Sequence, residues 1–394
     1  MRAEHQPWWF VALFALAAGG GAVAYVPLLT VLLPLKITSL MGSQDVSALA
    51  QVTFFGAIVA SLANIAFGVA SDRSGSRVPW ILAGLLASSV LLVAIGEAQD
   101  LVQLVALVMA WQVGLNMMLG PLVAWAGDCF PDSQKGTLGG ALSLAPAMGA
   151  LAGSLVTFEP LIASGQRLWV VAGLVCILVL PVTVLGRRRE RASLMAPRPE
   201  AIAEASEDQT RAAVARMWFA RFLVQIAEAG LFAFLLFWLR SLSPGFHENQ
   251  AANIFSTVLI CSVPLSLVIG RWSDRHGRPI LPLSACAAMA AAGLAVMAAS
   301  SGLTLAIAGY VVFGISGTIF LSLHTAQTLR VLPQPRNRGR DMGFFNLTNT
   351  VPSLVMPWLT IALVPAFGFT ALFALFAALS LGAALLLATI RRRT

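Results

Sequence analysis

Charged residues are scarce in this sequence: Asp, Glu, Lys and Arg make up 11% of its 394 residues, whereas 58% are hydrophobic. A soluble domain needs far more polar material to cover its surface, so this composition excludes an ordinary soluble globular protein. The lipid bilayer is the solvent that such a chain requires. The net charge of +8 needs no nucleic acid to explain it, because basic loops are favourable at the inner surface of a membrane.

Cysteine is scarce too, and motifs for catalysis are absent. The four cysteines, Cys129, Cys176, Cys261 and Cys286, are dispersed without a C-x-x-C pair, which argues against a disulfide framework and against a zinc site. The sequence also lacks the phosphate-binding loop G-x-x-x-x-G-K-[ST], metal-ligand spacing of His and Cys, and a serine nucleophile elbow. We therefore predict no enzymatic activity, no cofactor, no metal ion and no ATP-driven pumping, so that coupling comes from an ion gradient.

Long apolar runs, in contrast, fill most of the chain. Runs of roughly 20 residues cross about 30 Å of hydrocarbon as a helix. Such runs begin near twelve positions: Trp8, Val52, Trp80, Leu101, Thr137, Leu168, Trp218, Ala251, Pro279, Leu303, Met342 and Thr370. The sequence therefore predicts an all-α integral membrane protein with twelve transmembrane helices. The first run has no small-residue cleavage signal, so we expect it to be retained.

The cations fall mostly on one side of these spans. With the N-terminus inside, 22 of the 25 Lys and Arg residues lie in inner segments, and Lys36, Arg167 and Arg240 lie outside. Short cytoplasmic loops accumulate Lys and Arg, so both termini are predicted to be cytoplasmic. The preference for Arg over Lys indicates a bacterium with a GC-rich genome. We expect a multi-pass protein of the plasma membrane, the bacterial inner membrane.

A short loop motif occurs twice in the chain. The residues GVASDRSGSR, which begin at Gly68, are matched 202 positions later by GRWSDRHGR, which begins at Gly270. A second pair of loops, Lys135-Gly136 and Arg338-Gly339, has an offset of 203. Two loops in nearly one register indicate an internal duplication, and such duplications usually build a transporter around the interface of their halves.

At these residues the chain resembles the major facilitator superfamily. Its signature between the second and third spans reads approximately Gly-x-x-x-Asp-Arg-x-Gly-Arg-Arg, with a weaker copy between the eighth and ninth spans. The resemblance covers the whole chain and implies two pseudo-symmetric six-helix bundles around a central cavity. The bundles are residues 1–186 and 217–394, and the polar stretch 187–216 is a cytoplasmic linker. Ser76 departs from the basic pattern, and Arg77 follows as its substitute.

The resemblance also implies a cytoplasmic gate, whose contacts break when the inner side opens. Carried over to this chain, Asp72, Arg73 and Arg77 would face the start of the eleventh span, near Arg338, Arg340 and Asp341. Asp274, Arg275 and Arg278 would face the start of the fifth span, near Asp128, Asp132 and Lys135. A carboxylate at a helix N-terminus gains from the helix dipole. The alternative is that these residues are turn formers and topology anchors.

One acidic residue stands apart from the other sixteen: Glu228 falls in the middle of a span. It lies ten residues beyond Trp218, hence about 15 Å into the membrane at 1.5 Å per residue. A charged carboxylate is costly there, which favours its protonated form and a proton-linked role. Arg221 and Gln225 share its helical face and are further candidates for proton coupling. The alternatives are direct pairing with a cationic substrate and a neutral acid that packs inside the bundle.

Other polar and aromatic side chains lie inside apolar spans. The candidates for substrate contact are Tyr25, Asn64, Trp111, Gln112, Asn116, Asn346 and Asn349. Amides direct hydrogen bonds at a solute and an indole stacks on a ring, although amides also join helices to one another. His324, near the inner end of the tenth span, is a further proton-coupling candidate because histidine titrates near neutral pH.

These features together predict a secondary active transporter that moves a small organic solute by alternating access, coupled to protons. Its partners are the solute, the proton and the lipid bilayer. The stretches that begin at Asp132 and Arg338 are similar to proton-coupled sucrose and glycoside carriers, which indicates uptake. The element around Pro146 is similar to drug/proton antiporters, which indicates efflux of hydrophobic compounds. A non-transporting assembly factor or sensor on the same fold is a third alternative.

Overall fold

The computed structural model describes residues 5–41, 45–158, 162–186, 207–243, 245–246, 248–332 and 337–390, and its regular segments are all helical. This is the predicted all-α class. Ten helical segments of the described chain are long and apolar enough to cross a membrane. The two remaining predicted spans, near Trp218 and Met342, lie in α10 (Glu207–Leu242) and in the first part of α14 (Arg338–Ala388).

Contacts divide the chain into two compact units, and each unit contains a short segment from the other half of the sequence. Unit 1 comprises Met1–Pro131, Leu144–Pro197 and Gln334–Leu347, whereas unit 2 comprises Asp132–Ser143, Arg198–Pro333 and Thr348–Thr394. The predicted halves 1–186 and 217–394 follow the order of the chain and do not contain this exchange. Helix α10 begins inside the predicted linker 187–216, of which residues 187–206 lie outside the described part.

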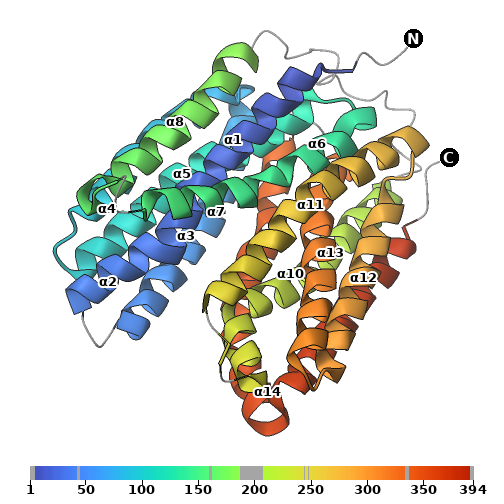
Figure 1. Ribbon diagram of the computed structural model, residues 1–394. Helices are drawn as coiled ribbons and strands as arrows, with labels where there is room; N and C mark the ends of the chain where they lie inside the picture. The colour runs from blue at the N-terminus through green and yellow to red at the C-terminus, as the bar shows by residue number, and fades with distance from the viewer. Residues whose placement is uncertain are drawn as a thin grey trace. The chain divides into compact units, whose positions relative to one another are not determined.

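Unit 1 contains most of the first half of the chain. Its helices are α1 (Trp8–Pro27), α2 (Leu33–Met41), α3 (Asp45–Ser74), α4 (Val78–Gly96), α5 (Leu101–Cys129), α7 (Leu144–Val156), α8 (Arg167–Leu185) and the first residues of α14. Helix α1 packs along α7 and α8, and α5 packs along α3 and α4 (Figure 1). A Cβ on Gly84 of α4 would lie 2.8 Å from the Gly114 carbonyl oxygen of α5. Glycine therefore permits this close approach.

The first predicted span contains Pro27 and Pro34, yet it is one continuous helical segment, Trp8–Met41. A proline inside a helix removes a hydrogen-bond donor and crowds the preceding carbonyl. Here α1 ends at Pro27, and Leu28–Leu32 form a π-helical turn before α2. This wider turn carries the helical chain past both prolines without a break.

Unit 2 contains α6 (Lys135–Leu142), α10, α11 (Glu248–His276), α12 (Ile280–Ala299), α13 (Leu303–Val331) and the rest of α14. Helix α6 lies beside α11 (Figure 1) and also packs against α13. The core includes Trp238 and Phe373, whose rings meet edge to face with centroids 4.5 Å apart. Gly368 has a φ of 70° and breaks α14 into two helical parts.

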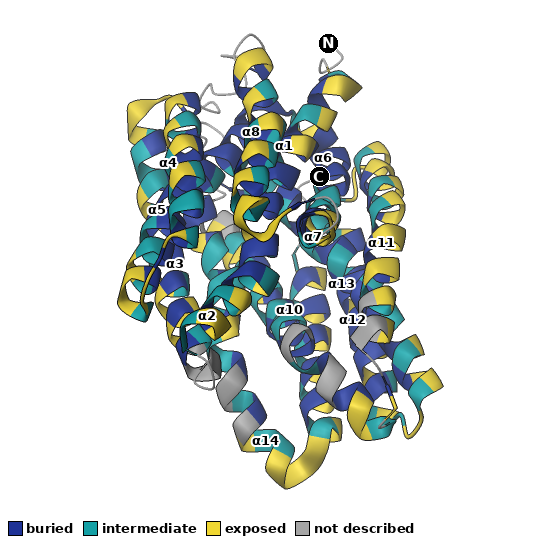
Figure 2. Cartoon of the chain, turned by 60° about the vertical axis from the view of Figure 1, so that its left-hand side comes forward, coloured by how far each residue is buried: buried dark blue, intermediate teal, exposed yellow. Residues whose placement is uncertain are grey.

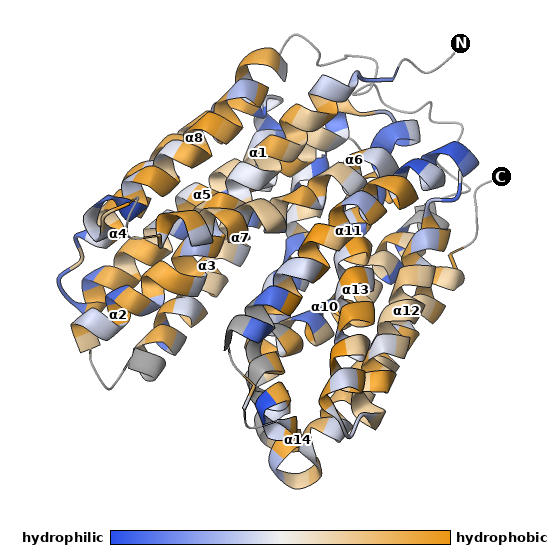
Figure 3. Ribbon diagram, in the orientation of Figure 1, coloured by the Kyte–Doolittle hydropathy of each residue, from blue (hydrophilic) through white to orange (hydrophobic). Residues whose placement is uncertain are grey.

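Large apolar side chains lie on the outside of the helices. Leu86 of α4 is 68% exposed, Trp169 of α8 is 66% exposed and Ile260 of α11 is 67% exposed. Figure 2 shows exposed residues along these three helices, and Figure 3 shows that α8 and α12 are hydrophobic over most of their length. Soluble monomers rarely expose apolar surface on this scale. The helices therefore present the lipid-facing surface of a multi-pass membrane protein.

Candidate functional site

The turn after α3 brings Asp72 to the beginning of α14, within unit 1. Helix α3 ends at Ser74, and Gly75 follows with a φ of 65°, a left-handed conformation that glycine adopts without strain. Asp72 accepts hydrogen bonds from the backbone N–H groups of Gly339 (2.9 Å) and Arg340 (2.8 Å). N–H groups in the first turn have no partner inside their own helix. Asp72 therefore caps α14 and is stabilised by its dipole.

Arg77 and Asp128 extend this cap into a network of four ionisable side chains. Arg77 Nη1 lies 2.6 Å from Asp72 Oδ1, and its Nε donates to Asp128 Oδ2 at 3.1 Å. Arg338 Nη1 donates to the other Asp128 oxygen at 2.5 Å. Asp128 is 1% exposed and Arg77 is 4% exposed, so each needs the opposite charge beside it. We expected Asp128 to lie near Asp274, and the structure places it in this network instead.

Asp274 makes the equivalent cap in unit 2. It accepts hydrogen bonds from the backbone N–H groups of Gly136 (2.9 Å) and Thr137 (2.6 Å), and from the Thr137 hydroxyl at 2.7 Å. It also accepts a hydrogen bond from Arg330 Nη2. Lys135 is buried beside this cap and donates to the Leu329 carbonyl oxygen at 3.0 Å. Both Asp–Arg loops thus bind the N-terminus of a helix, as the resemblance implied.

The two caps differ in the sign of one charge. Arg330 stands 202 positions after Asp128, the same offset that relates the two loops, so an arginine in the second copy replaces an aspartate in the first. In unit 1 the aspartate binds Arg77, which in turn binds Asp72. In unit 2 the arginine binds Asp274 directly. The second cap therefore binds its arginine through one aspartate, whereas two aspartates bind Arg77 in the first. Asp132 lies beside the second cap and pairs with Lys135 at 2.6 Å.

The remaining residues of the predicted gate lie at the surface. The side chains of Arg73, Arg275, Arg278 and Arg340 are exposed. Arg340 Nε donates to Asp341 Oδ1 at 2.9 Å. Exposed ion pairs contribute little to stability because water and salt screen them. Of the eight predicted gate residues, Asp72, Arg77, Asp274 and Arg338 form the buried contacts.

Glycine is required where each aspartate meets its helix. A Cβ on Gly339 would lie 2.8 Å from Arg77 Nη1 and 2.9 Å from Asp72 Oδ1, and a Cβ on Gly136 would lie 2.6 Å from Asp274 Oδ1. Cβ atoms essentially never come so near other heavy atoms. Because the blocking atoms belong to bonded ionic groups, they cannot move aside without breaking hydrogen bonds.

We expect Gly339→Ala to lower the free energy of unfolding by about 1–3 kcal/mol, the usual cost of overpacking a filled site. Thermal unfolding of the purified protein in detergent measures this loss. Gly165→Ala is the matched control, because a Cβ at Gly165 meets nothing within 4 Å. An equal shift of the two melting temperatures would show that the contact around Gly339 has room for a methyl group.

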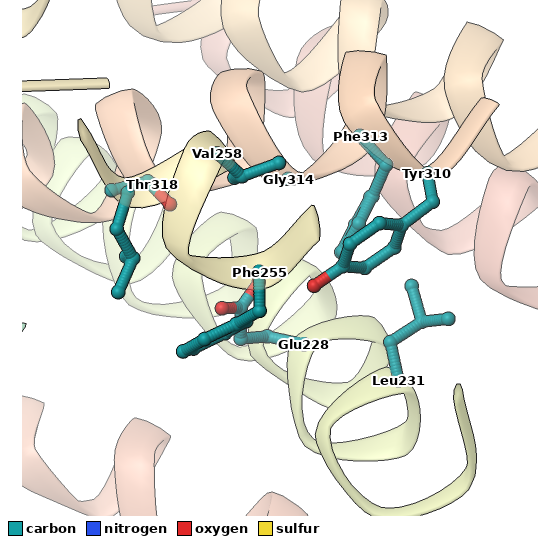
Figure 4. A pocket seen from close by; sticks show the side chains of 9 residues that line it. Glu228, Leu231, Phe255, Val258, Tyr310, Phe313, Gly314 and Thr318 are labelled. Atoms are coloured by element: carbon teal, nitrogen blue, oxygen red, sulfur yellow. The ribbon is translucent and has the colours of Figure 1, made fainter. Parts of the chain in front are cut away.

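A small pocket in unit 2 contains Glu228. It has a volume of about 20 Å³, room for one water molecule. The lining residues are Glu228, Leu231, Phe255, Val258, Leu259, Tyr310, Phe313, Gly314 and Thr318. Figure 4 shows the Glu228 carboxyl group and the Tyr310 hydroxyl directed into the same space, with Phe255 beside the carboxyl group. Glu228 Oε2 is enclosed and has no hydrogen-bond partner among the described residues.

Arg221 and Gln225, on the same face of α10 as Glu228, have different surroundings. Arg221 donates to Asn349 Oδ1 through Nε (3.3 Å) and Nη2 (3.1 Å), and its Nη1 donates to the Leu321 carbonyl oxygen and the Thr325 hydroxyl. These bonds join α10, α13 and α14 through neutral partners. Gln225 Oε1 is enclosed without a hydrogen-bond partner in the described chain.

His324 is fully buried between α13 and α10, and hydrogen-bond partners lie at both of its ring nitrogens. Nε2 lies 2.9 Å from the Met217 carbonyl oxygen, and Nδ1 lies 3.2 Å from the Thr328 hydroxyl. The carbonyl oxygen can only accept, so Nε2 donates to it; in a neutral ring, Nδ1 then accepts from the Thr328 hydroxyl. In this arrangement His324 connects two helices.

The predicted substrate contacts fall in both units. In unit 1, Asn64 Nδ2 donates to Asn116 Oδ1 at 2.9 Å, and Asn116 Nδ2 donates to Gln112 Oε1 at 3.3 Å, so these three amides form one buried chain between α3 and α5. Also in unit 1, Trp111 is fully buried, whereas Tyr25 is 37% exposed and Asn346 is half-buried. Asn349 belongs to unit 2 and holds Arg221.

Several partners of the site residues were not predicted from the sequence. Arg330 and Thr137 were not recognised as ligands of Asp274, and Tyr310, Phe255 and Thr318 were not recognised as neighbours of Glu228. The shared offset of 202 could have identified Arg330 as the counterpart of Asp128. No comparable signal marks the pocket, because its residues come from separate helices. Among the described residues, no group of three or more His, Cys, Asp and Glu side chains is placed to hold a metal ion.

The fold and the two caps define a class: multi-pass helical membrane proteins with a duplicated Asp–Arg loop that binds a helix N-terminus. The family model of the Major Facilitator Superfamily matches residues 217–394. Residues 217–394 thus carry the sequence pattern of this superfamily. No curated protein matches the chain significantly.

Solved structures of transporters share this fold over nearly the whole chain. The human organic anion transporter MFSD10 is 14% identical with a TM-score of 0.75, and the match covers 97% of this chain and 100% of that one. The Major Facilitator Superfamily transporter FucP in the outward conformation is 14% identical, with a TM-score of 0.71 and coverage of 98% and 99%. The proton:xylose symporter XylE is 12% identical, with a TM-score of 0.70 and coverage of 96% and 94%. At these identities the likeness shows the fold alone.

Proposed function

We propose that the chain is a secondary active transporter that moves a small organic solute across the plasma membrane by alternating access, coupled to protons at Glu228. The carboxyl group of Glu228 carries this proposal. It lies within a predicted transmembrane span, it lines a pocket, and one of its oxygens is enclosed without a partner among the described residues. A charged carboxylate at that depth costs about 2.5–3.5 kcal/mol on insertion scales, so a bound proton or a bound cation stabilises it.

The two aspartate caps supply the second part of the proposal, a gate at the cytoplasmic side. Asp72 and Asp274 bind segments 334–347 and 132–143, which come from the opposite half of the sequence. Hydrogen bonds and ion pairs of this kind can be exchanged between two packings of the same elements. In alternating access these contacts would break when the cytoplasmic side opens and form again when it closes.

Proton coupling has a direct test in proteoliposomes that contain a pH-sensitive dye. Sugars, amino acids, organic acids and hydrophobic cations are added outside in turn, and at least one class is expected to move protons across the membrane. Acidification of the lumen indicates symport, whereas alkalinisation indicates exchange of the solute for protons. Protein-free liposomes are the control. Solute uptake without proton movement would contradict proton coupling. Absence of both transport and binding for every class of solute would favour a non-transporting role.

A further inference from the structure

The pocket around Glu228 has a charge pattern that selects among solutes. Its single ionic side chain is the Glu228 carboxylate, since the other lining residues are aliphatic, aromatic, glycine and threonine. Arg221, the nearest cation along α10, lies two turns away, about 10 Å by helical rise. Its guanidinium is bound by Asn349, Thr325 and the Leu321 carbonyl oxygen. No cation of the pocket lining therefore neutralises the carboxylate.

Aromatic rings surround this carboxylate. Phe255 comes from α11, whereas Tyr310 and Phe313 come from α13. The face of an aromatic ring carries partial negative charge and attracts a cation within about 6 Å of its centre. Figure 4 shows the Tyr310 hydroxyl facing the same space as the Glu228 carboxyl group, so that its oxygen is available as a hydrogen-bond acceptor. The carboxylate and hydroxyl oxygens accept hydrogen bonds, and the carboxylate and the ring faces give the pocket a negative electrostatic potential.

The size of the pocket limits what enters it. A volume of about 20 Å³ holds a group no larger than a water molecule, which fits a primary ammonium and is too small for a bulky quaternary one. Leu231, Val258 and Leu259 complete the lining and offer apolar contact to the carbon atoms next to the charged group. The pocket therefore suits the polar end of a solute whose body is apolar.

We propose that this pocket binds the ammonium group of an organic cation, a primary amine attached to an apolar body. The inference rests on the proposed transport function and narrows its solute from any small organic compound to this class. An ammonium group neutralises the Glu228 carboxylate and donates to its enclosed oxygen. An anionic solute is repelled by the carboxylate, and a neutral one leaves that charge without a counterion.

Binding of three matched probes to the purified protein in detergent tests this inference. The probes are phenethylamine, which is an ammonium ion at neutral pH, the uncharged 2-phenylethanol, and the anion 3-phenylpropionate. Isothermal titration is expected to show at least tenfold tighter binding of phenethylamine than of either other probe. Glu228→Gln is expected to remove this preference. Glu97→Gln is the control, because it removes the same charge from an exposed position just after the C-terminal end of α4, and it is expected to keep the preference.

The affinities of the three probes for the wild-type protein test the inference even if a variant fails to fold. Tyr310→Phe provides a second variant, which keeps the ring and is expected to weaken phenethylamine binding several-fold. Equal affinities for the three probes, no saturable binding of phenethylamine, or an unchanged preference in Glu228→Gln would each overturn the inference. If a sugar or an acid moves protons in a Glu228-dependent way while amines do not bind, proton-coupled transport stands and the ammonium site fails.

Discussion

Replacing Asp128 by asparagine is expected to destabilise the protein by about 3–5 kcal/mol, the cost of removing one partner from a buried ionic group. Asp128 is 1% exposed and binds both Arg77 and Arg338. Asparagine has the same shape but no charge, so both guanidinium groups lose their shared counterion. Arg77 keeps Asp72 as a partner, whereas no other acidic side chain is within salt-bridge distance of Arg338 in the described chain.

Chemical or thermal unfolding in detergent measures this loss, with Asp100→Asn as the matched control. Asp100 is exposed at the N-terminus of α5, where it accepts from the Gln103 N–H group at 2.8 Å. Asparagine caps helices about as well as aspartate, so the control is expected to stay within about 0.5 kcal/mol of the wild type, as surface substitutions usually do. Equal stabilities of the two variants would mean that Asp128 does not hold a buried ionic network.

A double-mutant cycle separates the network from a general packing defect. Arg338→Gln removes the second cation, so the combination with Asp128→Asn is expected to cost clearly less than the sum of the single changes. Residues in direct contact usually show coupling of about 0.5–3 kcal/mol. The corresponding cycle in unit 2 uses Asp274 and Arg330, which form a direct pair. Additive effects in unit 1 would contradict the shared counterion.

The duplicated loops show how far the sequence could predict the site. The motif around Asp72 and its repeat around Asp274 predicted that each aspartate lies at the start of a later span, and both lie there. Such a prediction is possible because the loop is short and glycine fixes its turn. The position of Glu228 within a helix followed from hydropathy alone, since a single acid in a long apolar run is conspicuous.

Contacts that depend on tertiary packing could not be predicted in the same way. Asp128 stands three residues before Pro131 at the end of the fourth span, so the sequence placed it equally well near the start of the fifth span. Only the packing of α4 against α5 brings it to Arg77, the N-cap residue of α4. The pocket around Glu228 likewise takes side chains from α10, α11 and α13. Helical periodicity shows which residues share a face, but not which face of another helix lies opposite.

The course of the helices also could not be predicted fully from the sequence. Pro27 and Pro34 lie inside the first predicted span, and a π-helical turn carries the helix past them. Hydropathy does not reveal this turn. The exchange of segments 132–143 and 334–347 between the units was also invisible from hydropathy. Apolar runs report which residues cross the membrane. They carry no information about which neighbour each part of a helix contacts, because lipid-facing and helix-facing positions are both apolar.

Glu228→Gln is expected to reduce solute-driven proton movement in proteoliposomes at least 100-fold, to the level of protein-free vesicles. Glutamine keeps the length and shape of the side chain but can neither release a proton nor pair with a cation. A 100-fold loss corresponds to about 2.7 kcal/mol at 1.36 kcal/mol per factor of ten, similar to the cost of a charge within the membrane. Since glutamine fits the same space, the melting temperature is expected to stay near that of the wild type.

Glu97→Gln and Glu228→Asp separate the loss of the carboxyl group from other effects. Glu97 is exposed beyond the end of α4, so its replacement is expected to leave proton movement unchanged. Glu228→Asp keeps an ionisable group one methylene shorter, and we expect it to retain partial coupling. If Glu228→Gln kept full solute-driven proton movement at an unchanged melting temperature, Glu228 would have only a packing role. The coupling group would then have to lie elsewhere, and among the other acidic residues none falls in the middle of a predicted span.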